Sequence, residues 1–140
     1  MQRYKVLERV IALFYLEENM KKTVSILGTK YELRLDVPEH KDKDLTGRFG
    51  YCCPTMKRIV VVDLNTIESW KDETSYSKHV QTLTTIRHEV IHAFLYESGL
   101  WGSSLESTNW AMNEEMIDWI ANQFPKILKV FRELGCEDEI

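Results

Sequence analysis

The chain has 140 residues, a hydrophobic share of 44%, a charged share of 29% and a formal net charge of −4. This length and composition are typical of a globular protein, and we expect a single domain over residues 1–140. The acidic balance and the lack of a dense lysine and arginine run argue against a nucleic-acid partner. No apolar stretch reaches the ~18 residues of a membrane span.

The N-terminal segment, residues 2–20, predicts an amphipathic helix. Its apolar residues recur at helical spacing, which marks one face: Val6, Val10, Leu13 and Phe14. Charged residues lie between them, so the segment lacks the continuous apolar region of a secretory signal. The chain has three cysteines, two of them adjacent, which is a poor disulfide framework. We therefore expect reduced thiols and a cytoplasmic protein.

The middle of the chain predicts strands. Residues 31–37 alternate between apolar and polar side chains, which is typical of a strand with one buried face. Residues 47–53 and 58–64 predict two more strands, and the turn residues at 54–57 indicate a hairpin between them. The continuous apolar run at 59–62 favours a strand that is covered on both faces. We expect a small, mostly antiparallel sheet of about three strands.

Helices should follow the sheet. The first should begin with Ser75 or Ser77 as its cap and run to Glu97 or Ser98, and Gly99 is well placed to end it. A further helix should begin near residues 107–108. Pro125 should kink or end that helix, and a last helix should carry residues 127–134. One helix, then strands, then helices is the order of an α+β fold.

The helix predicted to run from Ser75 or Ser77 to Glu97 or Ser98 contains the sequence His-Glu-Val-Ile-His at residues 88–92. His88 and His92 are four residues apart and project from one helical face, so both can bind one zinc ion. Glu89 lies between them and can act as a general base. Structural zinc sites usually have protein ligands, often cysteines, at all four coordination positions. No cysteine lies near these histidines in sequence, which favours a site with an open position.

A third ligand is expected from the later helix, where Glu114 and Glu115 are neighbours. They point about 100° apart on a helix. Glu114 shares its face with Trp110, Ile117 and Ala121, the apolar side that should turn to the core. A carboxylate that is aimed inward is costly unless it meets a cation. We therefore favour Glu114 over Glu115, which remains the alternative as a ligand and is otherwise a solvated helix residue.

Asp118 lies one helical turn beyond Glu114. Zinc-bound histidines usually donate their other ring N–H to a carboxylate or carbonyl oxygen. Asp118 could accept this bond from His88 or from His92. The alternative for Asp118 is an ordinary surface acid, and the sequence does not decide between the two.

The two segments together resemble the gluzincins, zinc metallopeptidases in which a glutamate on a later helix is the third ligand. Thermolysin-like members have H-E-x-x-H followed by N-E-x-x-x-D, and residues 88–92 and 113–118 match both patterns. In size the chain is more similar to the compact ImmA/IrrE-type and SprT-like domains, which include many phage and mobile-element proteins. The resemblance implies a minimal zincin-like fold. It covers residues 87–124 only.

The resemblance also implies roles for individual residues. His88, His92 and Glu114 would bind Zn²⁺, Glu89 would be the general base, and Asp118 would orient a histidine. The expected reaction is hydrolysis of a peptide or protein substrate by a zinc-bound water. The alternative is a binding or regulatory module that keeps the metal site but has little catalytic activity. The oligomeric state stays open.

Two further features of the reaction can be assigned candidates. A peptide substrate could pair in extended form with an exposed strand, and residues 47–53 are our candidate for this sheet edge. The developing oxyanion needs a donor besides the metal. Four side chains are candidates, although a structural role is the more ordinary reading of each: Tyr51, Tyr76, His79 and Tyr96.

Overall fold

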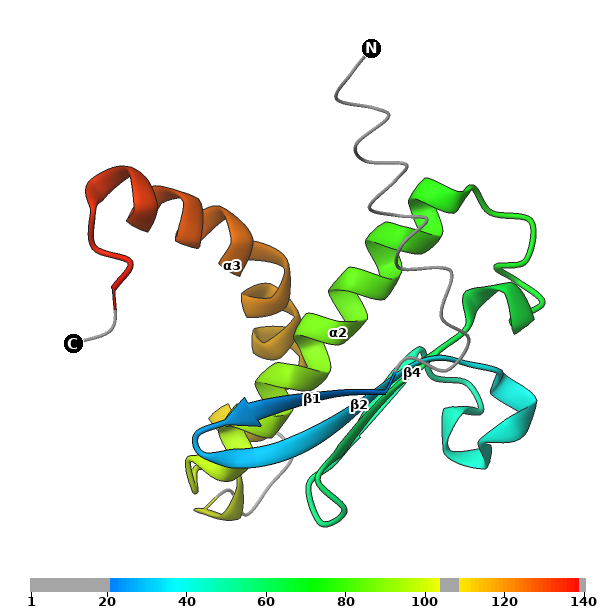
Figure 1. Ribbon diagram of the computed structural model, residues 1–140, viewed down its shortest axis with the longest axis horizontal. Helices are drawn as coiled ribbons and strands as arrows, with labels where there is room; N and C mark the ends of the chain where they lie inside the picture. Colours follow the sequence, from blue (N-terminus) through cyan, green and yellow to red (C-terminus); the bar gives the residue numbers. More distant parts are fainter. Residues whose placement is uncertain (1–20, 104–108, 139–140) are drawn as a thin grey trace.

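A computed structural model describes residues 21–103 and 109–138, so the predicted helix over residues 2–20 lies outside the described residues. The fold is α+β, with one helix packed across a sheet and a second helix beside the first (Figure 1). The strands and helices, in chain order, are β1 (Lys21–Ile26), β2 (Thr29–Val37), β3 (Gly50–Cys53), β4 (Arg58–Val62), α2 (Ser75–Glu97) and α3 (Glu114–Leu134).

The sheet has four strands in the order β1-β2-β4-β3. The predicted hairpin of β3 and β4 is confirmed, and these strands pair antiparallel. The expectation of about three strands is wrong, because β1 forms an additional antiparallel hairpin with β2. β2 and β4 pair in parallel, so the sheet is mixed. This order leaves β3 at one edge of the sheet, next to the helix that carries the histidines.

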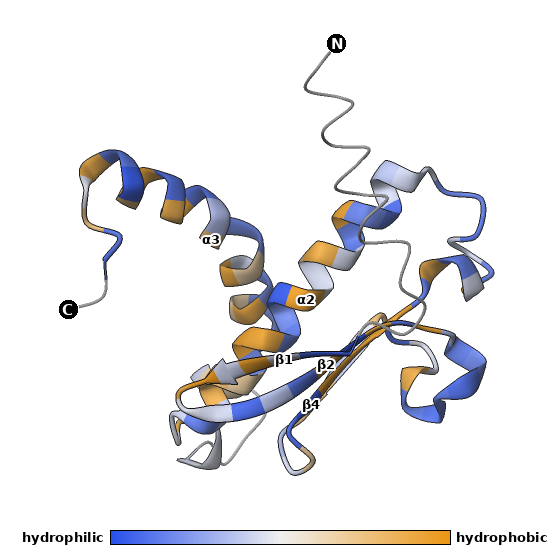
Figure 2. Ribbon diagram, viewed as in Figure 1, coloured by the Kyte–Doolittle hydropathy of each residue, from blue (hydrophilic) through white to orange (hydrophobic). Residues whose placement is uncertain are grey.

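The central strand β4 is buried on both faces, as its continuous apolar sequence predicts. Ile59 and Val61 are in the core between the sheet and α2, where Ala93 of α2 is fully buried. Val60 and Val62 face the opposite side, in a second core cluster that includes Leu45 and Leu64. Figure 2 shows β4 as a mostly hydrophobic ribbon beside the more polar β2. The packing of Ile59 and Val61 against α2 therefore fixes the position of the sheet relative to this helix.

The helix α2 runs from Ser75 to Glu97, close to its predicted bounds. Its N-cap is Thr74 rather than the predicted Ser75 or Ser77, because the Thr74 side chain accepts a hydrogen bond from the Ser77 backbone N–H at 3.0 Å. Gly99 ends the helix as predicted, with a left-handed φ of 84° that suits glycine. The His-Glu-Val-Ile-His segment therefore lies within a long, regular helix.

The helix α3 begins at Glu114, so the predicted start near residues 107–108 is wrong. Asn113 is its N-cap, and the Asn113 side chain accepts a hydrogen bond from the Met116 backbone N–H at 2.8 Å. Ile117 packs with Leu95 of α2 in a third core cluster. The predicted separate helix over residues 127–134 is also wrong, because α3 continues through Pro125 to Leu134.

Hydropathy is distributed unevenly along the two helices. Figure 2 shows polar and apolar residues alternating around both helices rather than a wholly apolar surface. Within the described residues, no helix combines the length and apolar character needed to cross a membrane.

Candidate metal centre

Three chemically active side chains of α2 lie close together. His88, Glu89 and His92 each offer one ligand atom, and these atoms all lie within 4.8 Å of one another. The Nε2 atoms of the two histidines are 3.0 Å apart. The four-residue spacing causes this approach, because residues i and i+4 are neighbours on one helical face. The histidines are therefore held by a single regular helix.

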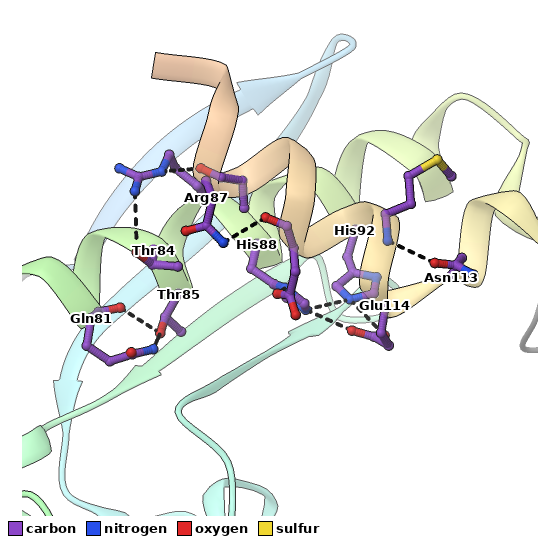
Figure 3. A network of polar contacts seen from close by, with 12 residues as sticks. Gln81, Thr84, Thr85, Arg87, His88, His92, Asn113 and Glu114 are labelled. Atoms are coloured by element: carbon purple, nitrogen blue, oxygen red, sulfur yellow. Dashed lines mark hydrogen bonds and ion pairs between the residues drawn. The ribbon is translucent and has the colours of Figure 1, made fainter. Parts of the chain in front are cut away.

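The helix α3 brings two carboxylates to the same place, as Figure 3 shows for Glu114. Glu114 Oε2 lies 3.0 Å from His88 Nε2, and Glu114 Oε1 lies 3.2 Å from His92 Nε2. Asp118 Oδ1 lies 2.7 Å from the other ring nitrogen of His88, Nδ1. Since Asn113 caps α3, Glu114 is its first residue and Asp118 is one turn later. The N-terminal turn of α3 is thus aligned with the histidines of α2.

The donor atoms fit a tetrahedral metal ion. Bonds of about 2.0–2.1 Å around zinc place neighbouring ligand atoms roughly 3.3 Å apart, and the observed separations are 3.0–3.2 Å. The position of the ring proton of His88 bears on the same question. When the Nδ1 proton of His88 faces Asp118 and Nε2 carries no proton, the Nε2 lone pair faces the Glu114 carboxylate. These two acceptors repel, and either a second proton on the ring or a bound cation removes the repulsion.

Glu89 is the buried carboxylate of the group, with 8% of its surface exposed. Burial raises the pKa of Glu89 to about 7, and the nearby Glu114 carboxylate adds to this rise. His88, the backbone N–H of Cys52 and the charge of Arg48 oppose it. A carboxylate with a pKa near neutrality is suited to accept and then release a proton.

Burial also affects His92. It lowers the pKa of His92 by disfavouring the charged ring, while the Glu114 carboxylate opposes this shift. A neutral imidazole is the form of histidine that binds a metal. The environment of His92 therefore favours the ligand form of its side chain.

The group opens into a cavity of about 430 Å³ between α2 and β3. His88, Glu89, His92 and Glu114 line it on the helical side. Its other lining residues come mainly from β3 and the adjoining loops: Arg48, Gly50, Tyr51, Cys52, Pro54 and Trp101. A smaller cavity of about 200 Å³ adjoins it and shares Gly50, His88 and Glu89. The cleft therefore passes directly beside Glu89.

Sequence reasoning named residues 47–53 as the candidate edge for a peptide but gave no individual role to Arg48 or Cys52, and it did not identify Trp101. They carry no local motif, and the fold alone brings them beside the helix. The Cys52 thiol is poorly suited to be a nucleophile here, because burial is the largest cause that raises its pKa to about 12. Arg48 supplies positive charge beside a largely acidic group of side chains.

The structure corrects the reasoning that led to Glu114. Ile117 and Ala121 are fully buried, as predicted, but Trp110 is 53% exposed and precedes α3. The Glu114 side chain is 65% exposed, so it is not aimed into the core. As the first residue of α3, it lies at the rim of the α2–α3 contact and reaches the histidines from there. Its neighbour Glu115 is exposed as well.

The four candidate oxyanion donors lie in different places. Tyr51 lines the cavity of about 430 Å³, and the other three candidates are not among the described residues that line it. The Tyr51 hydroxyl donates a hydrogen bond to Asp42 at 2.7 Å. Tyr76 is 74% exposed in the first turn of α2, and His79 lies one turn further along that helix. Tyr96 packs against Trp101, with ring centroids 5.5 Å apart.

Comparison with known proteins gives no match. No protein-family model, no curated protein and no solved structure matches this chain. The function is therefore inferred from the geometry and chemistry of the side chains themselves.

Proposed function

We propose that this chain is a zinc-dependent peptidase of the gluzincin type. The observation that carries the proposal is the convergence of His88 Nε2, His92 Nε2 and the Glu114 carboxylate, with separations of 3.0–3.2 Å. A histidine-rich set with one carboxylate suits zinc better than magnesium or calcium, which prefer oxygen ligands. Three protein ligands leave a position open towards the cleft, as in catalytic zinc sites.

The residues around these ligands support the same assignment. Asp118 contacts His88 Nδ1 at 2.7 Å, and such a contact fixes the ring orientation and leaves Nε2 for the metal. Zinc in this site would act as a Lewis acid towards a carbonyl oxygen and would acidify a water molecule. Glu89 is the base of the proposed reaction. Its carboxylate would take the water proton and deliver it to the leaving amine.

The sheet edge supports a peptide as the substrate. The Phe49 carbonyl accepts a hydrogen bond from Val62 of β4, so the alternate residues Gly50 and Cys52 direct their backbone groups away from β4. Both residues also line the cleft. The Cys52 backbone N–H interacts with Glu89, so an extended peptide would pair with the Gly50 backbone and the Cys52 carbonyl while the peptide carbonyl lies beside Glu89.

The proposed compartment is the cytoplasm. All three cysteines, Cys52, Cys53 and Cys136, are free thiols. Free thiols are the ordinary state of cysteine in a reducing compartment.

The test of the proposal combines metal content with one substitution. Purified protein should contain one zinc per chain, and it should cleave an unfolded protein substrate in a reaction that a chelator stops and zinc restores. Glu89→Gln should keep the zinc and lose most of this activity, because a positioned base contributes ~10²–10⁴ in rate. Full activity in Glu89→Gln would remove Glu89 as the base. Zinc binding without any cleavage by the unaltered protein would instead favour a binding module.

A further inference from the structure

The side chain of Arg87 connects α2 to α3 next to the candidate metal centre. Arg87 Nε donates a hydrogen bond to the Ala121 backbone carbonyl at 2.7 Å across a separation of 34 residues in sequence. Arg87 Nη2 also lies 3.4 Å from the Thr84 hydroxyl, one turn earlier on α2. Figure 3 shows Arg87 extended towards α3, with a dashed line that ends on that helix. This contact is unusual because carbonyls within a helix normally accept from their own helix.

Pro125 explains why the Ala121 carbonyl is available. In a helix, the carbonyl of residue 121 would accept a hydrogen bond from the N–H of residue 125. Proline has no N–H, and its ring also presses against that carbonyl. Pro125 lies inside α3, and Ala121 is fully buried. A buried carbonyl without a donor is costly, and Arg87 supplies the donor that Pro125 lacks.

The position of this contact connects it with the metal ligands. Glu114, Asp118 and Ala121 are on successive turns of α3, on the side that faces α2. Glu114 contacts both histidines, Asp118 contacts His88, and Ala121 contacts Arg87, the residue before His88. A shift of α3 by one residue moves it 1.5 Å along its axis and turns it by about 100°. Such a shift would separate Asp118 from His88.

We propose that Arg87 and Pro125 form a positioning pair that fixes α3 against α2 so that Glu114 and Asp118 face the histidines. Of these four contacts, the one between Arg87 and Ala121 involves neither a metal ligand nor the carboxylate that orients His88. It can therefore align the helices whether or not a metal is bound. This inference rests on the proposed zinc site, since it concerns the affinity of that site.

A double-mutant cycle on zinc affinity tests the pair. The variants are Arg87→Met, Pro125→Ala and their combination, and the measurement is competition with a zinc chelator under conditions where each variant is folded by circular dichroism. Arg87→Met should weaken zinc binding about tenfold, the lower end of the range for residues that support metal ligands. In the Pro125→Ala background the same change should have little effect, because the new alanine supplies the helical N–H to the Ala121 carbonyl.

A matched control is Arg132→Met, an arginine of α3 that pairs with Glu137 near the end of the helix. This control should leave zinc affinity unchanged. If Arg87→Met does not fold, Arg87→Lys can replace it in the cycle, with a smaller expected loss of zinc affinity. A purely structural role of Arg87 would lower the stability of the metal-free protein without changing the zinc affinity of the folded protein, and that result would overturn the inference.

The remaining outcomes separate this inference from the proposed function. An equal loss of zinc affinity with Pro125 present and in the Pro125→Ala background would also overturn the pair, because it would show that Arg87 acts without Pro125. If the unaltered protein binds no zinc, the metal centre itself is refuted and the positioning role is overturned with it. Normal zinc binding by the unaltered protein and by Arg87→Met together would overturn the positioning role alone.

Discussion

Gly50 lies where the sheet edge approaches the helix α2, and its replacement by alanine is a sharp test of the fold around the candidate site. A Cβ atom on Gly50 would lie 2.8 Å from Thr85 Cγ2 on α2 and 2.8 Å from the Val60 backbone oxygen on β4. Carbon atoms normally approach one another to about 3.5–4.0 Å. One neighbour is the backbone of the central strand, which cannot move aside easily. The added methyl group must therefore displace β3 or α2.

The expected cost can be estimated from two opposing effects. Overpacking of this kind typically costs about 1–3 kcal/mol, and the backbone contact favours the upper half of that range. Replacement of glycine by alanine also stabilises by about 0.4–1 kcal/mol through the unfolded chain. The net loss for Gly50→Ala should be about 1–2.6 kcal/mol. For a chain of this length it corresponds to a fall in Tm of roughly 3–10 °C.

The assay is urea and thermal unfolding followed by circular dichroism. Gly102→Ala is the matched control, because a Cβ there meets nothing within 4 Å, so it should keep only the gain of about 0.4–1 kcal/mol through the unfolded chain. Thr85→Ser removes the methyl group that Gly50→Ala would strike, so the double variant should lose less than the sum of the two single variants, by about 0.5 kcal/mol or more. A Gly50→Ala protein as stable as the control would refute the close approach of β3 to α2.

Three other substitutions test separate parts of the structure. Asn113→Ala should destabilise the protein by about 1 kcal/mol through loss of the α3 cap, and it should also weaken zinc binding because Glu114 follows directly. Glu114→Ala should lower zinc affinity far more than the matched change Glu115→Ala, as measured by chelator competition. Glu97→Gln should lower the Tm at pH 7, because Lys57 and two hydroxyl groups donate to this carboxylate and hold its pKa below its usual range. A lowered pKa stabilises the folded protein above the ordinary range of glutamate, about 4.3, and this stabilisation disappears as the pH falls through the folded-state pKa.

A specific result would contradict each of these three predictions. Unchanged zinc affinity in Asn113→Ala, with the expected loss of stability, would separate the cap from the metal centre. A larger loss of affinity in Glu115→Ala would transfer the ligand role to that residue. For Glu97→Gln, a difference in Tm that stays constant or grows below the ordinary glutamate pKa would show that the charged form does not stabilise the fold.

Periodicity predicted the elements with the strongest patterns. The alternation at residues 31–37 and the apolar run at 59–62 both correspond to strands, and α2 has nearly its predicted ends. The strand β1 was missed because its turn, Leu27–Gly28, differs from the usual hairpin signals. Both turn residues have positive φ, 48° and 84°, which is common for Asn-Gly but unusual for leucine. Tertiary pairing with β2 outweighs that weak local signal.

The candidate metal centre was predictable where one helix determines the geometry. The spacing of His88 and His92 is enough to bring their rings together on α2. The position of Glu114 depends on the Asn113 cap and on the contact between two helices, which periodicity does not encode. Hydrophobic patterning favoured Glu114, which lies beside both histidines in the structure, but it also predicted that Glu114 is buried, and Glu114 is exposed. No individual role was predicted for Arg48 or Arg87, because their neighbours come from distant parts of the chain.

The central claim is that two histidines of α2 and one glutamate of α3 hold zinc. A crystal structure of protein purified without chelator, with anomalous diffraction data on both sides of the zinc absorption edge, tests it most directly. We predict one zinc per chain, bonded at about 2.0–2.2 Å to His88 Nε2, His92 Nε2 and Glu114. A different metal, a different set of ligands or no metal at this position would contradict the claim.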